Sequence, residues 1–244
     1  MTNKNILKNK NCLITGATGG LGKELAVEFA KKDANLFLTA RDFKKLDLLK
    51  EQIENLPEFH NKVVSESVDL TNIIELQNLF KKIGKIFHNI DVLVNCAGIF
   101  PVKELTDYTL KDFDNCFSIN VKSPFLLCQK FSQDMIKNRW GRIVNIASSS
   151  AYNGFRNTSI YCASKHALLG LSRSIHAELK EHNVRTFCVS PGSIKTSMSK
   201  AVLENPDYHT FLDPKEVAKF IVYLISFDNE MISEEIQLNR IGYN

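Results

Sequence analysis

Short apolar segments alternate with helical segments along almost the whole chain of 244 residues. Seven segments have the length and apolar character of buried strands, at residues 12–15, 35–39, 63–68, 92–94, 143–147, 184–190 and 235–238. Between them lie stretches with apolar residues at helical spacing. These are residues 20–32, a segment that follows the second strand and ends at about residue 56, and residues 73–87, 113–136, 158–182 and 213–226. This alternation predicts a mostly parallel sheet of about seven strands with helices on both faces. No linker, internal repeat or low-complexity tract interrupts it, so we expect residues 1–244 to form one doubly wound α/β domain.

The composition argues against several classes of function. Hydrophobic residues make up 44% of the chain and charged residues 24%, and the net charge of +4 is spread without a basic block, so we expect no binding to nucleic acid. Residues 1–11 are polar and lysine-rich, unlike a secretory signal, and no run approaches the ~18 apolar residues of a membrane span. The six cysteines form no CxxC pair, and the six histidines have no partner at a metal-ligand spacing. We therefore predict a cytoplasmic protein with reduced thiols, no bound metal and no membrane partner.

Tyr161 and Lys165 are four residues apart in the long helix expected at residues 158–182. Residues at this spacing lie on one face of a helix. We expect that face beside a packed apolar stripe formed by Ile160, Ala163, Ala167, Leu171, Ile175 and Leu179. A phenol ordinarily has a pKa near ~10, and a fixed ammonium nearby lowers it, which would suit Tyr161 to proton transfer. The motif is short, however, and a surface tyrosine one turn before a surface lysine has the same spacing.

A glycine-rich segment follows the first strand and opens the first helix. Its spaced glycines are Gly16, Gly20 and Gly22. Glycines permit a tight turn and a close approach of the backbone to a diphosphate, and a helix N-terminus offers free N–H groups. We predict that this turn binds phosphate, with Thr18 and Leu21 among the contacts. A tight turn that binds no ligand is the alternative.

Other notable residues follow later strands, at the edge where a doubly wound sheet binds ligands. The Asn-Cys-Ala-Gly turn at 95–98, Ser148, the Tyr161–Lys165 pair and the Pro-Gly pair at 191–192 occur in one order with the glycine turn. With these motifs, from about residue 10 to 238, the chain resembles the short-chain dehydrogenase/reductase family of single-domain Rossmann-fold oxidoreductases. Each motif is weak alone, whereas five in register are specific.

The resemblance implies a catalytic set of Asn120, Ser148, Tyr161 and Lys165. Ser148 comes 13 residues before Tyr161, as the family's serine does. For Asn120 the sequence adds a physical reason, because Pro124 lies four residues later and has no N–H to give to the Asn120 carbonyl. We expect a kink there, and the resemblance implies that the freed carbonyl holds a water that reaches Lys165. A kink that serves only packing is the alternative.

The resemblance also implies which residues hold a nicotinamide dinucleotide. Asp69, followed by Leu70, matches the acidic residue that meets the adenine. Asn95 and Gly98 match the turn that supports the sheet and lies beside the adenine ribose. The segment after the sixth strand matches the one that contacts the nicotinamide amide, through Pro191, Gly192, Ile194 and Thr196.

The end of the second strand bears on the choice between NADP and NAD. An acidic residue there would bind the ribose diol of NAD, whereas an arginine accepts the 2′-phosphate of NADP. Ala40 stands where the family's NAD-binding members usually have Asp, and Arg41 follows, so we predict NADP(H) in preference to NAD(H). Two features oppose this prediction. Asp42 is placed to pair with Arg41, and Thr18–Gly19 lacks the basic residue of many NADP-binding members.

The implied function is an NADPH-dependent carbonyl reductase or alcohol dehydrogenase. Hydride would pass between the nicotinamide and the substrate carbon while Tyr161 exchanges a proton with the substrate oxygen. Ser148 would stabilise the charge that develops on that oxygen. Lys165 and Tyr161 would contact the nicotinamide ribose, and Lys165 would lower the pKa of Tyr161.

The sequence leaves the small-molecule substrate open. Candidates for the substrate walls are Ile99, Phe100, Tyr152, Phe155 and residues 197–212. A 3-oxoacyl-(acyl-carrier-protein) reductase stays a candidate, although residues 233–240 replace the Thr-Gly turn and Gly-Gly end of many such relatives. A nucleotide-binding regulator without turnover is the alternative of a different class. The family commonly pairs the helices that correspond to residues 113–136 and 160–179, so we expect a homodimer or homotetramer.

Overall fold

One parallel sheet of seven strands runs through the computed structural model, which describes residues 5–202, 206–229 and 232–241. The strand order is β3-β2-β1-β4-β5-β6-β7, with parallel neighbours throughout. The strands are β1 (Asn11–Thr15), β2 (Asn35–Ala40), β3 (Val63–Ser67), β4 (Val92–Asn95), β5 (Gly141–Ile146), β6 (Val184–Pro191) and β7 (Glu235–Leu238). The predicted doubly wound parallel sheet is confirmed, and each predicted strand end lies within two residues of the observed one. Residues 1–4 of the polar N-terminal segment lie outside the described part.

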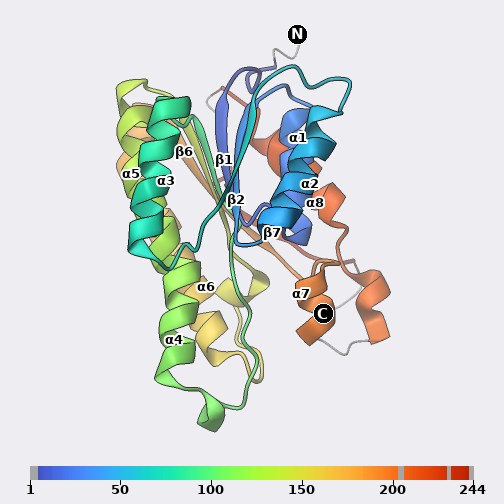
Figure 1. The fold of residues 1–244 in the computed structure, drawn as a ribbon. Coiled ribbons are helices and arrows are strands. Elements are labelled where there is room, and N and C mark those ends of the chain that lie inside the picture. Colours follow the sequence, from blue (N-terminus) through green and yellow to red (C-terminus); the bar gives the residue numbers. More distant parts are fainter. Residues whose placement is uncertain (1–4, 203–205, 230–231, 242–244) are drawn as a thin grey trace.

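Helices cover both faces of the sheet (Figure 1). One face carries α1 (Gly20–Ala30), α2 (Phe43–Glu54) and α8 (Pro214–Ile225); the other carries α3 (Ile73–Ile86), α5 (Ser123–Lys137) and α6 (Ser159–Leu179). Two shorter helices, α4 (Leu110–Phe117) and α7 (Ser197–Val202), precede α5 and follow β6. Each face has its own apolar core, with Phe29 and Ile221 buried in the first and Phe131 and Met135 in the second. The burial of these side chains is the main force that holds the layers together.

Several helices begin with a side chain that accepts hydrogen bonds from the first turn. Asp42 does so for α2, Asn72 for α3 and Asp213 for α8, and Thr109 forms a reciprocal capping box at α4. Among the described helices without such a cap is α1, which begins after Gly19 at the glycine-rich turn. Its first-turn N–H groups have no partner within the helix and remain available to an anion.

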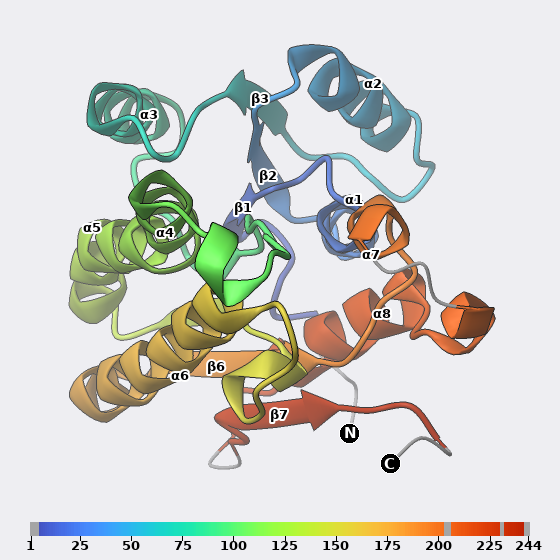
Figure 2. The same ribbon diagram turned by 90° about the horizontal axis from the view of Figure 1, so that it is seen from below.

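The strand order reverses beside β1, which pairs with both β2 and β4. The connections that leave β1 and β4 therefore run to opposite sides and open a crevice at the carboxyl ends of the strands. Figure 2 shows the molecule from this edge, where the start of α1, α7 and the loop after β4 surround the end of β1. Proteins with this type of sheet bind their ligands in such a crevice, so we expect a ligand site here.

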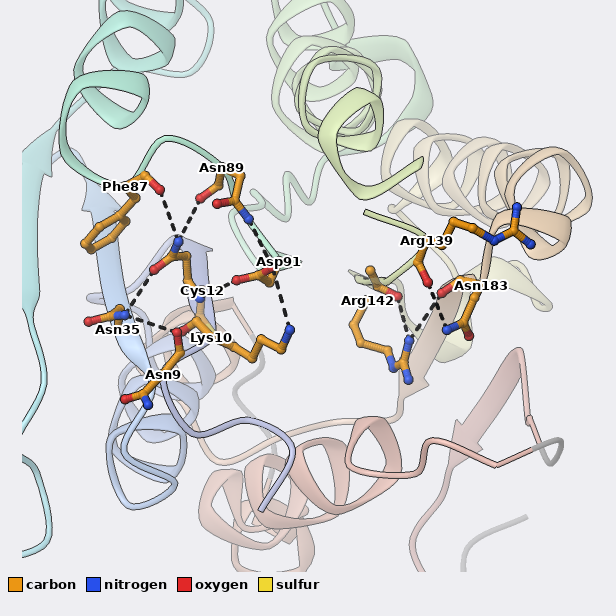
Figure 3. A network of polar contacts seen from close by, with 12 residues as sticks. Asn9, Lys10, Cys12, Asn35, Phe87, Asn89, Asp91, Arg139, Arg142 and Asn183 are labelled. Atoms are coloured by element: carbon orange, nitrogen blue, oxygen red, sulfur yellow. Dashed lines mark hydrogen bonds and ion pairs between the residues drawn. The ribbon is translucent and has the colours of Figure 1, made fainter. Parts of the chain in front are cut away.

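Polar side chains fasten the opposite edge, at the amino ends of the strands (Figure 3). Asn89 Nδ2 donates to Asp91 Oδ1 at 3.0 Å, close to the start of β1. Arg142, fully buried in β5, donates to the carbonyl oxygen of Asn183 at 3.5 Å and forms an ion pair with Asp228 at 2.6 Å. Burial lowers the pKa of Arg142 to about 10, so the guanidinium stays charged at neutral pH. This edge is structural and lies away from the crevice.

The apolar stripe expected to pack in the Tyr161 helix is only partly covered. In α6 the buried residues include Lys165, Leu168 and Ser172, whereas only Leu179 of the predicted stripe is buried. In the segment expected at residues 113–136, Phe113 and Phe125 are 42% and 44% exposed. Helical spacing identifies residues that share a face, but it does not say whether the sheet or another surface covers that face.

The helix expected at residues 113–136 is interrupted. A π-helical turn, Ser118–Lys122, separates α4 from α5, and the N–H of Ser123 donates to the carbonyl oxygen of Ser118, five residues back. Pro124 is at the start of α5 and has no N–H to donate. The interruption expected near Asn120 thus takes the form of a π turn, a feature that is frequent at functional sites.

Candidate active site

The glycines between β1 and α1 are required by close contacts. Gly16 has a φ of +65°, and a Cβ there would lie 2.7 Å from the Cα of Ala97. A Cβ on Gly22 would lie 2.2 Å from the carbonyl oxygen of Gly16, and one on Gly20 would lie 2.6 Å from Thr196 Cγ2. The turn is therefore tight, lies against the loops after β4 and β6, and presents the uncapped end of α1. These features fit the diphosphate of a dinucleotide.

Two adjoining clefts open at this edge of the sheet. The first has a volume of about 260 Å³, and the second has a volume of about 610 Å³. Leu21, Ser148, Tyr161 and Lys165 line the first, whereas Thr18, Arg41, Asp69 and Leu70 line the second. The residues that line both are Gly16, Gly19, Cys96, Gly98, Ile99 and Met198. Because they share these walls, the clefts are two halves of one groove across the glycine turn.

Ser148, Tyr161 and Lys165 meet in the first cleft. Ser148 follows β5, and the other two lie one turn apart on α6. A hydrogen bond joins the side chains of Ser148 and Tyr161. Lys165 is 4% exposed, donates to the carbonyl oxygen of Ile146 at 2.8 Å, and has its Nζ 5.7 Å from the centre of the Tyr161 ring. The structure thus places the tyrosine and lysine in a cleft rather than on an open surface.

Burial governs the ionisation of the tyrosine and the lysine. Desolvation raises the pKa of Tyr161 to about 12, and the hydrogen bond with Ser148 offsets only part of that rise. Desolvation lowers the pKa of Lys165 to about 8, against a smaller opposite effect of nearby thiols. The expected lowering of the Tyr161 pKa is therefore wrong for this structure, because removal of water from the buried phenol is the largest influence on that pKa. At neutral pH the phenol holds its proton.

Asn120 is fully buried in the π turn, and both ends of its amide are engaged. Its Oδ1 accepts from the N–H of Ile99 at 3.0 Å, and its Nδ2 donates to the carbonyl oxygen of Ile99 and to Ser164 Oγ, each at 3.0 Å. Ser164 donates in turn to the carbonyl oxygen of Tyr161 at 2.7 Å. The side chain therefore fastens the loop after β4 to α6. The sequence reasoning considered only the Asn120 carbonyl and missed Ser164, whose place inside the Tyr-x-x-x-Lys motif was the available signal.

Two cationic residues, Arg41 and Lys45, line the second cleft. Asp42 Oδ1 accepts from the backbone N–H of Lys45 at 3.1 Å, and Asp42 Oδ2 pairs with Lys45 Nζ at 3.3 Å. Within the described part of the chain, Asp42 forms no ion pair with Arg41, so the pairing that would neutralise Arg41 is not seen. Lys45 is a further candidate contact that the sequence reasoning missed, although it lies one turn after Arg41.

Asp69 and Leu70 line the same cleft. Asp69 Oδ1 accepts from the N–H and the hydroxyl of Thr71 at 2.9 and 2.8 Å, and these bonds fix the carboxylate in the wall of the cleft. Gly98 lies where the two clefts meet, and a Cβ there would come within 3.8 Å of Lys165 Nζ. A glycine at this position leaves room beside the ammonium.

Asn95 is the predicted cofactor residue that the structure places elsewhere. Its side chain is 2% exposed and lines neither cleft. Nδ2 donates to Asn145 Oδ1 at 2.7 Å, and the two asparagines are partners in the β4–β5 register. The expected support of the sheet is visible, whereas Asn95 is not among the residues that line the two clefts.

The segment after β6 brings four predicted residues to the first cleft: Pro191, Gly192, Ile194 and Thr196. Ser199, on α7, holds this segment by donating to the carbonyl oxygen of Ile194 at 2.6 Å and accepting from the N–H of Thr196 at 3.2 Å. The sequence reasoning missed Ser199, and a serine in the first turn after Thr196 was the signal. Residues 203–205 of this segment lie outside the described part.

Tyr152, expected among the substrate walls, instead belongs to a polar brace behind Ser148. Its hydroxyl donates to Glu235 Oε2 at 3.0 Å, and Arg173 donates to both oxygens of the same carboxylate, at 2.5 and 2.9 Å. Burial, followed by the Glu235 carboxylate, raises the pKa of Tyr152, so its hydroxyl keeps the proton that it donates. The brace ties the turn after Ser148 to α6 and β7.

We expect Glu235→Gln to lower kcat several-fold while leaving the KM for the cofactor unchanged. The amide keeps the size of the side chain but loses the ion pair, so the turn that holds Ser148 is less well fixed, and small misplacements of reacting groups reduce turnover. Global stability should change little, because exposed ion pairs contribute about 0–1 kcal/mol. Steady-state kinetics with Glu234→Gln as the control test this, since Glu234 pairs with His176 instead. Equal kinetics of the two variants would contradict it.

The described residues contain no group of three or more His, Cys, Asp or Glu side chains arranged to hold a metal ion. In the same part of the chain, no helix is both long enough and apolar enough to span a membrane. The six cysteines are free thiols.

Comparison with known proteins agrees with the geometry. The sequence profile described as short chain dehydrogenase matches residues 10–207. A 3-oxoacyl-(acyl-carrier-protein) reductase of Thermotoga maritima is 31% identical over 238 residues, covering 94% of this chain and 96% of the reductase. A short-chain type dehydrogenase/reductase from Mycobacterium marinum is similar in structure, with a TM-score of 0.85 and 28% identity over 96% of this chain and 95% of that chain. A metagenomic short-chain oxidoreductase in complex with NADP has a TM-score of 0.83 and 27% identity over 96% of this chain and 98% of that chain. The chain belongs to the short-chain dehydrogenase family and is an NAD(P)-dependent oxidoreductase.

Proposed function

We propose that this protein is an NADP(H)-dependent carbonyl reductase or alcohol dehydrogenase that works through Ser148, Tyr161, Lys165 and Asn120. The observation that carries the proposal is the meeting of Ser148, Tyr161 and Lys165 in a cleft beside the uncapped end of α1. We also propose that residues 1–244 form one nucleotide-binding domain, since a single sheet extends from Asn11 to Leu238.

The residues around the groove fit a dinucleotide. The tight glycine turn at Gly16 and the N–H groups of α1 would hold the diphosphate. Asp69 and Leu70 would meet the adenine in the second cleft, and Ile194 and Thr196 would meet the nicotinamide amide in the first. When bound, the nicotinamide supplies or accepts the hydride.

Tyr161 donates its proton to the carbonyl oxygen of the substrate in the reductive direction. Its raised pKa keeps the phenol protonated at neutral pH, which is the form that this step needs. Ser148 donates a hydrogen bond to the same oxygen and stabilises the negative charge that develops there. In the oxidative direction Tyr161 acts as the base and must first lose its proton.

Lys165 fixes the geometry of this step. Its ammonium lies between the Ile146 carbonyl and Gly98, where it would contact the nicotinamide ribose next to Tyr161. Asn120 positions the loop after β4 through Ile99 and positions the catalytic helix through Ser164. We propose that its carbonyl supports proton resupply to Lys165 through water.

The proposed preference for NADP(H) over NAD(H) rests on the second cleft. Arg41 and Lys45 both line it, and Asp42 is engaged by Lys45 as the cap of α2. Arg41 beside the expected position of the ribose 2′-oxygen favours a phosphate there, while Asp42, which also lines the cleft, is paired with Lys45.

We expect Arg41→Ala to raise the KM for NADPH about ten- to a hundredfold and to leave the KM for NADH nearly unchanged. A charge-assisted hydrogen bond contributes roughly 1.5–3 kcal/mol, which gives this range. Lys44→Ala is the matched control, because this neighbouring exposed lysine does not line the cleft. Equal effects of Arg41→Ala on the two cofactors would show that Arg41 does not contact the phosphate.

Two alternatives have observations in their favour. The Thermotoga maritima relative is named as a 3-oxoacyl-(acyl-carrier-protein) reductase, and the same catalytic cleft would serve that reaction. A non-catalytic regulator would use the same dinucleotide groove, but it has no need of a serine, tyrosine and lysine meeting in one cleft. A panel of carbonyl compounds, including 3-oxoacyl thioesters, should be offered with NADPH and followed at the nicotinamide absorbance. Turnover identifies an enzyme, and binding of NADPH without any turnover would favour the regulator.

We propose a homodimer or homotetramer formed through the outward apolar faces of α4, α5 and α6. A groove of about 420 Å³ runs between them, lined by Asp114, Phe117, Ser118, Val121, Lys122, Phe125 and Leu171. Leu171, from the apolar stripe of α6, and Phe125 of α5 both line it. A second copy of this chain would cover it. A cytoplasmic location also stays a prediction, supported by the free thiols.

Sedimentation at micromolar concentration is expected to show a species at least twice the 27.7 kDa of one chain. Phe125→Asp should shift it toward the monomer, because burying an unpaired carboxylate in an apolar contact is unfavourable. Leu48→Asp, on the exposed side of α2, should leave it unchanged. A wild-type monomer at this concentration would contradict the proposal.

A further inference from the structure

The side chains that line the first cleft, which holds Ser148, Tyr161 and Lys165, offer hydroxyls and apolar surface but almost no charge. Among the described residues that line it, Lys165 is the one charged side chain. Lys165 is 4% exposed and already donates to the Ile146 carbonyl at 2.8 Å, so its ammonium is engaged within the wall of the cleft. Residues 201–207, whose side chains are not described, contain no lysine, arginine or histidine in the sequence.

The apolar part of this wall is held in place. The Phe100 ring packs on Tyr161, with 4.4 Å between the ring centres and 55° between the planes. Just before it, Ile99 is fixed by both ends of the Asn120 amide. Just after it, the carbonyl oxygen of Pro101 accepts from the Tyr108 hydroxyl at 3.0 Å. With its backbone held on both sides, Phe100 presents a preorganised aromatic surface next to the proton donor.

We propose that the cleft accepts uncharged ketones and secondary alcohols with an apolar or aromatic substituent, and discriminates against carbonyl compounds that carry a carboxylate or phosphate. Phe100 is the specificity-determining residue. This inference rests on the proposed reductase function and names its substrate class. An anionic group on the substrate would lose its hydration on entering the cleft without gaining a cationic partner there, and this desolvation is unfavourable. A flat apolar substituent, in contrast, gains an aromatic contact with Phe100.

A pair of ketones that differ only in a remote charge tests the charge preference. Methyl 5-oxohexanoate and 5-oxohexanoate have nearly equal reactivity at the ketone, because three methylene groups separate it from the carboxyl end. With NADPH at saturation, we expect kcat/KM for the ester to exceed that for the acid by roughly a hundredfold, the size of an unmet charged hydrogen bond. Equal values, or a preference for the acid, would overturn the inference and leave the reductase function standing.

The role of Phe100 is tested with 4-phenylbutan-2-one and butan-2-one. Phe100→Ala should lower kcat/KM for the aryl ketone about tenfold and change that for butan-2-one little. Phe100→Leu should restore part of the loss. Phe155→Ala is the control, since Phe155 is 51% exposed and does not line the cleft. Equal loss on both ketones would overturn the assignment of Phe100 to specificity. If none of the four ketones turned over although NADPH binding was seen by its fluorescence, the proposed function and this inference would both fall.

Discussion

Replacing Tyr161 by phenylalanine is expected to lower turnover by ~10²–10⁴, the contribution of a positioned acid or base. The substitution removes one hydroxyl, the group that hydrogen-bonds to Ser148. The ring itself packs on Phe100 and keeps that contact. Folding and cofactor affinity should therefore survive. Steady-state turnover on the best carbonyl substrate, together with NADPH affinity from fluorescence, measures the two effects separately.

Tyr223→Phe is the matched control for this experiment. Tyr223 lies on α8, is 58% exposed and has no part in either cleft. It should retain full turnover. Near-normal turnover of Tyr161→Phe would instead remove the basis of the mechanism, and the spacing of Tyr161 and Lys165 would then be fortuitous.

The raised pKa of Tyr161 also predicts how the two reaction directions respond to pH. Because burial raises this pKa to about 12, the phenol stays protonated across the neutral range, and Tyr161 should not limit carbonyl reduction there. Alcohol oxidation needs the phenolate, so its rate should rise as the pH increases. An oxidative rate that stays flat with pH would contradict the role of Tyr161 as the base.

Replacing Lys165 by alanine is expected to be nearly as damaging and, unlike Tyr161→Phe, to weaken cofactor binding. One ammonium would serve both the ribose and the region of the phenol, so turnover should fall by about 10² or more. The loss of a charged hydrogen bond should raise the dissociation constant of NADPH roughly ten- to a hundredfold. The exposed Lys180, at the end of the same helix, gives the control Lys180→Ala.

The pH dependence of cofactor binding separates the charge of Lys165 from its packing. Burial lowers the pKa of Lys165 to about 8, so its ammonium form predominates below that pH and is lost above it. NADPH affinity should therefore fall as the pH rises through about 8 in the wild type. Lys165→Ala should not show this fall. The same pH dependence in both proteins would assign it to another group.

The parallel sheet, the glycine turn and the meeting of Ser148, Tyr161 and Lys165 could be predicted because each follows from the order and spacing of residues along the chain. Glycine spacing sets a turn, and residues that follow parallel strands must emerge at the same edge. The partial exposure of the apolar stripe on α6 could not be predicted in this way. Helical periodicity gives a shared face and is silent about what covers it.

The ionisation of Tyr161 could not be predicted either, because it depends on how much water the folded cleft excludes. The spacing to Lys165 suggested a lowered pKa, whereas burial in the folded cleft raises it. Asn95 illustrates a different limit. A motif places the residue at the end of β4, but only the packing against Asn145 decides which way its side chain points.

The π-helical turn at Ser118–Lys122 sets the rotational phase of the chain that follows it. Successive residues of an α-helix are rotated by about 100°, so the one extra residue of a π turn delays α5 by that angle relative to α4. In this phase the Asn120 amide reaches Ile99 while Phe125 stays on the outer face beside Phe117. Deleting one residue from the turn would rotate either Asn120 away from Ile99 or Phe125 away from the outer face. The one extra residue of the π turn therefore determines two things at once: whether the buried Asn120 amide reaches Ile99, and which side chains form the proposed subunit contact.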